Sequence, residues 1–130
     1  MAKPRVFVSR EIFSDSLDQI RSKTEMDLWT DELPPPRDVL LNKVKGISGL
    51  LCLLTDKVDA ELMDAAGPNL KVLSQIAVGY DNINISEATQ RGIAVGNTPD
   101  VLTQTTADAA WALLMAASRR VVESSRAVKE

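Results

Sequence analysis

The loop Ala77-Val78-Gly79-Tyr80-Asp81-Asn82 combines residue types that could bind a small anion. It follows Leu70 to Ala77, an apolar segment that we expect to be a strand, and open α/β sheets bind ligands beyond the carboxyl ends of their strands. Gly79 lets a ligand approach the backbone closely, and adjacent amides there can bind an anion without a charged side chain. Taken alone, the pattern favours the simpler interpretation of a plain turn between a strand and a helix.

Several other kinds of site are excluded by what the sequence contains. With no histidine and one cysteine, it can build neither a Ser-His-Asp triad nor a cysteine-based zinc site, and we expect no metal centre. The phosphate-binding pattern G-x-G-x-x-G and the P-loop are both missing. A flavodoxin-type flavin loop or the acidic pair of a receiver domain would have to stand at Ser9-Arg10-Glu11, which fits neither.

Composition and charge are those of one globular domain. The chain has 130 residues, of which 45% are hydrophobic, and its 15 basic and 18 acidic residues give a net charge of −3. No basic stripe is present, so we expect no nucleic-acid partner. The longest apolar run, Ala109 to Ala117, is about half of the ~20 residues that cross a bilayer, so we expect no membrane partner and a cytoplasmic, soluble protein.

Strand and helix patterns alternate over the first 96 residues. The run Gly49 to Leu54 is apolar without alternation, which is typical of a parallel strand buried on both faces. The alternation predicts an α/β domain of the flavodoxin-like class, with five parallel strands and helices on both faces of the sheet. The predicted strands are 5–9, 25–29, 49–54, 70–77 and 92–96, and the predicted helices are 11–23, 37–45, 59–66 and 86–90, the last capped by Ser86.

The last third of the sequence predicts a long helix. Thr98-Pro99-Asp100 resembles a helix start, and Thr105 with Asp108 resembles a capping box. Ala109 to Ala117 is apolar on all sides, so we expect a second domain or a second subunit to cover it, and Trp111 to lie in a core or an interface. The helical pattern continues to the last residue without a cap, and we interpret the chain as truncated.

Two single residues have simpler interpretations. Cys52 lies within an apolar strand, so we expect a buried small hydrophobe and not a reactive thiol. Asp56 follows the same strand and is predicted to cap the next turn.

Several segments, in this order and spacing, resemble a known family. The sequence is similar to the amino-terminal part of the D-isomer-specific 2-hydroxyacid dehydrogenases, and most of all to their glyoxylate/hydroxypyruvate reductase branch. The resemblance covers the chain from Val6 onward. The segments that carry it are Gly49–Asp56, Asn69–Val72, Val78–Asn82, Arg91–Ile93 and Val95–Thr103.

The resemblance implies that three segments of the chain belong to different parts of the enzyme. Residues 1–98 would form a substrate-binding (lid) domain, 99–122 an interdomain helix, and 123–130 the start of a coenzyme-binding domain that is otherwise absent. The family implies that the amides of Val78 and Gly79 hold the substrate carboxylate. It further implies that Leu53 and Leu54 line the pocket, and that Thr106 and Val78 approach the coenzyme.

The same resemblance implies the partners. The parent enzyme would use NAD or NADP to reduce a small 2-keto acid, such as glyoxylate or hydroxypyruvate, to the D-2-hydroxy acid. We expect neither coenzyme to bind this chain tightly. Family members are usually dimers, and we expect a homodimer through the helix around Trp111.

The family's catalytic groups do not map onto this sequence. Its arginine, its glutamate and the histidine that acts as acid and base all lie downstream of the matching region, as does its glycine-rich dinucleotide motif. We therefore expect no catalytic residue here and no activity of the 130-residue chain alone. Two alternatives remain open: a non-catalytic α/β module that associates with itself, and a small-molecule sensor that uses only the Val78-Gly79 loop.

Overall fold

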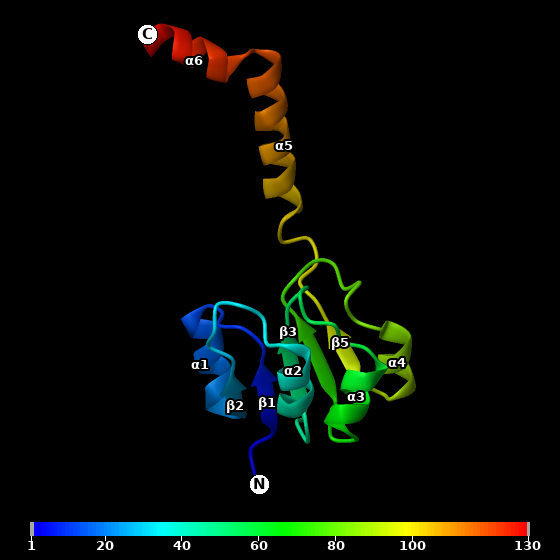
Figure 1. Cartoon of the computed structure of the whole chain (residues 1–130). Coiled ribbons are helices and arrows are strands. Elements are labelled where there is room, and N and C mark those ends of the chain that lie inside the picture. Colours follow the sequence, from blue (N-terminus) through cyan, green and yellow to red (C-terminus); the bar gives the residue numbers. More distant parts are fainter. Residues whose placement is uncertain (1, 130) are drawn as a thin grey trace. The chain divides into compact units, whose positions relative to one another are not determined.

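A computed structural model describes residues 2–129 of the chain (Figure 1). The chain divides into two units, one ending at Thr98 and the other beginning at Pro99. The first unit contains a parallel sheet in the order β2-β1-β3-β4-β5, which confirms the predicted flavodoxin-like α/β fold. Its strands are β1 (Arg5–Val8), β2 (Glu25–Leu28), β3 (Gly49–Cys52), β4 (Val72–Gln75) and β5 (Ala94–Gly96).

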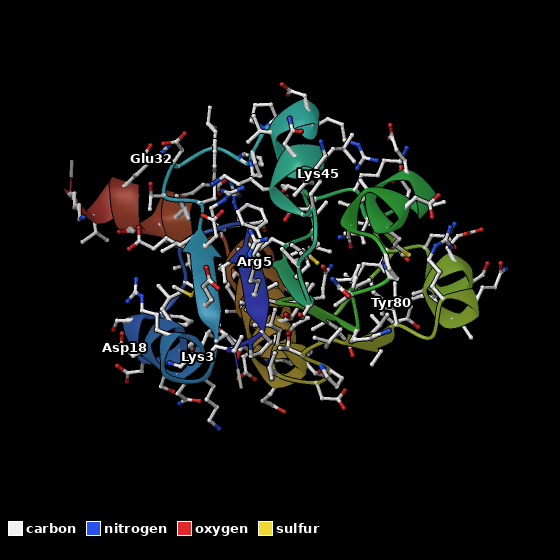
Figure 2. All side chains as sticks on the ribbon, turned by 90° about the horizontal axis from the view of Figure 1, so that it is seen from below. Lys3, Arg5, Asp18, Glu32, Lys45 and Tyr80 are labelled. Carbon is white, nitrogen blue, oxygen red and sulfur yellow. The ribbon has the colours of Figure 1, made fainter. Side chains whose placement is uncertain are left out.

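Helices cover both faces of the sheet, as the alternation predicts. Seen from below, α1 lies on one side of the strands, and α2 and α3 lie on the other (Figure 2). Successive side chains of a strand point to opposite faces, so the strands supply two separate cores. The helices of this unit are α1 (Ser14–Lys23), α2 (Arg37–Lys43), α3 (Ala60–Ala66) and α4 (Ile85–Gln90).

The larger core lies beneath α2, α3 and α4. Phe7 and Leu50 point to it from the centre of the sheet, and Leu62 and Ala88 reach it from α3 and α4. The smaller core, beneath α1, joins Val8, Leu17 and Leu51. All four residues of β3 are buried, as its continuous apolar run predicts. The two cores fix the central strands, and with them the loops at the carboxyl ends of those strands.

The α1 face of the sheet is only partly covered. Val72 and Ile76 of the β4 segment are 44% and 38% exposed there, beside a hollow of about 590 Å³ between α1 and the strands. Gly49 faces Val72 across the strand pair, and a Cβ at Gly49 would stand 3.0 Å from Val72 Cγ1. A side chain at that position would therefore require Val72 to shift.

The N-terminal caps of two helices differ from those predicted. The cap of α4 is Asn84, whose side chain accepts from the Glu87 N–H at 3.2 Å, and Ser86 lies inside the helix. The long helix, α5 (Thr103–Ser118), begins after Leu102 without any side-chain cap, so the predicted box from Thr105 is wrong. Thr105 is already within the first turn, where its backbone is helical.

The predicted helix over 99–122 is shorter in the structure. Asp100 and Arg120 have φ angles of 63° and 51°, a left-handed conformation that a continuous right-handed helix cannot contain. Helix α5 therefore lies between them, and a separate helix, α6 (Val121–Lys129), follows. Neither helix has a buried residue among those described in the second unit. None of the helices within residues 2–129 has the length and apolarity that a membrane span requires.

Candidate functional site

The predicted site residues of the first unit meet at the carboxyl edge of the sheet. Leu53 and Leu54 follow β3, and Val78 and Gly79 follow β4, its paired neighbour. Leu54 lies against Gly79: a Cβ built on Gly79 would be 4.0 Å from Leu54 Cδ2. Leu54 is 58% exposed and Val78 41%, whereas Leu53 packs partly against the smaller core. The four residues therefore form one surface over two adjacent loops.

The amides of Val78 and Gly79 are available for a ligand. Within residues 2–129, neither N–H donates a hydrogen bond to another part of the protein. Their neighbour Ile76 still follows the sheet, with its N–H donating to the Cys52 carbonyl at 3.1 Å. Two consecutive, exposed N–H donors beyond the end of a parallel strand can bind a carboxylate without a cation.

A buried carboxamide supports this loop from below. Gln75, at the end of β4, is 1% exposed. Its Nε2 donates to the Gly79 carbonyl at 3.1 Å and to Asn82 Oδ1 at 2.6 Å, and its Oε1 accepts from Cys52 Sγ at 3.2 Å. Gln75 therefore fixes the path of the chain from Gly79 to Asn82.

Asn82 connects the two loops. Its Nδ2 donates to the carbonyls of Leu53 and Asp56 at 3.1 and 2.8 Å. An isolated parallel bridge between Val58 and Ile83 continues the connection outward. Asn82 and Gln75 together therefore link the Leu53 carbonyl to the Gly79 carbonyl.

Asp56 organises the loop after β3 from the inside. This residue is 2% exposed, and its Oδ2 accepts from Ser9 Oγ at 2.5 Å and from the Leu53 N–H at 2.9 Å. It therefore holds the turn that leads to Leu54 and joins it to the end of β1. Burial, and then the charge of Asp56, raise the pKa of the Cys52 thiol to about 12, which agrees with an inert, buried cysteine.

The sequence interpretation missed Gln75 and Asn82 as site residues. A signal for Gln75 was present, since a polar residue inside an apolar strand must find buried partners. Asn82 could not be assigned this way, because its partners lie 26 and 29 residues upstream.

Thr106, the residue expected near the coenzyme, belongs to the second unit. It lies in the first turn of α5, where its side chain is exposed and its N–H donates to the Leu102 carbonyl at 2.9 Å. Its proposed approach to the nicotinamide stays a prediction.

A comparison with known protein families identifies the family of the chain. Residues 6–130 match the family model described as D-isomer specific 2-hydroxyacid dehydrogenase, catalytic domain. The chain belongs to the D-isomer specific 2-hydroxyacid dehydrogenase family. The resemblance seen in the sequence is thereby confirmed.

Individual proteins are similar over most of the chain. A glyoxylate reductase of Korarchaeum cryptofilum is 58% identical over 98% of this chain and 38% of its own length. The crystal structure of the protein TT0316 from Thermus thermophilus superimposes with a TM-score of 0.83 at 42% identity, covering 93% of this chain and 39% of that one. The structure of an NADPH-dependent glyoxylate/hydroxypyruvate reductase of Sinorhizobium meliloti, in complex with NADP and malonate, superimposes with a TM-score of 0.64 at 33% identity. The match covers 88% of this chain and 34% of that one. This chain thus spans less than half of each relative.

Structures of this family contain NAD or NADP, and a dinucleotide requires a loop that binds its phosphates. A Rossmann cradle needs glycines in the turn that leaves the carboxyl end of a strand. The glycines with positive φ, which are Gly46, Gly67 and Gly92, precede β3, β4 and β5 and so lie at the opposite edge. Gly79 follows the carboxyl end of β4, but it stands alone there and not in a G-x-G-x-x-G pattern. The described residues therefore do not fit the phosphates of a dinucleotide.

Proposed function

We propose that this chain is the substrate-binding portion of a cytoplasmic, NAD(P)-dependent dehydrogenase that reduces 2-keto acids, glyoxylate to glycolate or hydroxypyruvate to the D-2-hydroxy acid. The observation that carries the proposal is the pair of N–H groups without partners within residues 2–129, at Val78 and Gly79, beside Leu54. The glyoxylate reductase relatives support the same substrate class.

In this proposal the chain binds and orients the substrate. The carboxylate accepts from the two amides, and the carbon that carries the keto group lies over Leu53 and Leu54. These apolar side chains exclude water from one side of the reacting carbon. Reduction also needs a hydride donor and a proton donor, and neither role is assigned to the described residues. Because the sequence contains no histidine, residues 1–130 are expected to bind without turnover.

Titration of the ¹⁵N-labelled chain with glycolate, followed by NMR, tests the anchor. We expect the amide signals of Val78 and Gly79 to shift most, because their N–H groups would bind the carboxylate directly. Glycolamide has the same size without the charge and serves as the matched control. Equal responses to both compounds, or shifts confined to other loops, would rule out a carboxylate site here.

Turnover is a separate test. The chain is mixed with glyoxylate and NADH or NADPH, and the loss of the reduced coenzyme is followed by its absorbance. We expect no change beyond the rate without protein. Measurable turnover would show that residues 1–130 hold catalytic groups that we have not assigned.

We further propose that the protein forms a homodimer through α5. Trp111, Leu113 and Leu114 are 66%, 72% and 56% exposed, which is unusual for such large apolar side chains on one helix. A non-catalytic, self-associating module would use the same surface, and the carboxylate titration distinguishes the two.

A further inference from the structure

Two hydrogen bonds hold the back of the proposed carboxylate site. The side-chain Nδ2 of Asn97 donates to the Val78 carbonyl at 2.8 Å, and the Thr98 N–H donates to the Ala77 carbonyl at 3.0 Å. Both donors follow β5 directly, and β5 is the parallel neighbour of β4. The end of β5 therefore contacts the loop on the side that carries these two carbonyls.

Because the peptide bond is planar, these two hydrogen bonds also fix the direction of the Val78 and Gly79 N–H groups. In a trans peptide the C=O and the following N–H point in opposite directions. The Ala77 carbonyl shares its peptide with the Val78 N–H, and the Val78 carbonyl shares its peptide with the Gly79 N–H. Since both carbonyls are held by residues 97–98, both N–H groups point away from that segment, and so toward the same side.

The next peptide is fixed separately. The Gly79 carbonyl accepts from Gln75 Nε2 at 3.1 Å. The Val78–Gly79 peptide thus has one hydrogen bond, the one from Asn97, because its own N–H has no partner within residues 2–129. A peptide that ends in a glycine and loses its only hydrogen bond can rotate readily.

We propose that Asn97 is a positioning residue that keeps the Gly79 N–H aimed at the substrate carboxylate. This inference rests on the proposed function, in which the Gly79 amide binds that carboxylate. Asn97 acts through the Val78 carbonyl and has no assigned contact with substrate. The corresponding role at Val78 is filled by the Thr98 backbone, so Asn97 is the member of the pair that a substitution can remove.

The substitution Asn97→Ala tests this role, and Asn97→Asp, which keeps the shape but loses the donor, provides a second variant. Asn69→Ala is the matched control, because Asn69 is exposed and lies before β4, at the other edge of the sheet. We expect the ¹⁵N order parameter of Gly79 to fall from about 0.85, the value of rigid backbone, to about 0.6 in both Asn97 variants. Asn69→Ala should leave it unchanged.

Glycolate affinity is measured on the same samples. We expect Asn97→Ala to bind about tenfold more weakly, which corresponds to ~1.4 kcal/mol. The thermal midpoint should change little, because the lost hydrogen bond is exposed. An unchanged order parameter, or unchanged affinity in a variant whose Gly79 has loosened, would overturn the inference.

The two proposals fail in different ways. If Gly79 loosens in the variants but wild type shows no glycolate response, the carboxylate site is wrong while Asn97 still orders the peptide. If wild type binds glycolate through Gly79 and Asn97→Ala binds equally well, the site stands and the role of Asn97 is wrong.

Discussion

Gln75 Nε2 lies 2.6 Å from Asn82 Oδ1, and this contact joins the end of β4 to the far end of the loop that it begins. The two side chains together reach the Gly79 carbonyl on one side and the Leu53 carbonyl on the other. A loop with two available amides is thereby kept in one conformation by carboxamides at its base. Preorganised donors bind an anion with less loss of conformational freedom than mobile ones.

Removing the Asn82 side chain should therefore destabilise the fold. Asn82→Ala leaves the Asp56 carbonyl without its donor and removes one of the two donors to the Leu53 carbonyl, which keeps the Asp56 N–H. We expect the free energy of unfolding to fall by about 1–3 kcal/mol. Urea unfolding followed by circular dichroism measures the loss. Asn69→Ala, which removes an exposed asparagine, is the control, and an equal effect of the two substitutions would contradict the proposed connection.

Gly49 should tolerate no side chain. A Cβ there would stand 3.0 Å from Val72 Cγ1 and 3.4 Å from Val6 Cγ2, so Gly49→Ala must move one of two β-branched side chains. We expect a loss of about 1–3 kcal/mol in unfolding free energy. Gly96→Ala is the matched strand control, since no atom lies within 4 Å of its Cβ position. Similar stability of both variants would show that the contact around Gly49 relaxes freely.

The carboxylate of Asp59 should stabilise the fold in a way that depends on pH. Partial burial opposes its ionisation, but hydrogen bonds from Arg37 (2.5 Å), Lys57 (3.1 Å) and the Leu62 N–H (3.2 Å) outweigh burial and lower the pKa of Asp59 from 3.8 to about 2. A carboxyl that is more acidic in the folded state stabilises the fold above its unfolded pKa. That stabilisation is lost as the pH falls from about 4 toward 2.

The variant Asp59→Asn isolates this charge, because asparagine caps a helix as well as aspartate does. We expect wild type to be more stable than the variant at neutral pH, and the difference to shrink as the pH falls below about 4. Thermal unfolding over the range from neutral pH down to the folded-state pKa gives both curves. A difference that is independent of pH would contradict the role of the charge.

Cys52 should be inert while the protein is folded. Burial and the charge of Asp56 raise the pKa of its thiol to about 12, so almost no thiolate is present near neutral pH. We expect a chromogenic disulfide reagent to leave the folded chain unmodified and to react with the single thiol of each chain in denaturant. Rapid reaction of the folded chain would show that the loops over β3 open readily.

The sequence predicts the sheet well, but it does not predict some contacts and helix ends. The apolar runs at Phe7 and Leu50 predict a parallel sheet with buried central strands, because such strands must be apolar on both faces. The role of Asn97 could not be predicted, because it depends on a side chain that crosses from the end of β5 to a loop 19 residues upstream. The interruption at Arg120 was also missed, since arginine is a good helix former and its positive φ reflects the local turn.

The exposed apolar side chains of α5 lead to a prediction about assembly. Trp111 presents a large apolar surface that is 66% exposed, and Leu114 and Met115, three and four residues later, extend it along the same side of the helix. Burying such a surface in a symmetric interface would stabilise a dimer, and a glutamate at position 111 would place a charge within it. We expect sedimentation equilibrium to give twice the chain mass for wild type and the single chain mass for Trp111→Glu. The conservative variant Trp111→Phe should keep the dimer, because it retains an aromatic ring. A single chain mass for wild type, or a dimer that survives Trp111→Glu, would remove α5 as the interface.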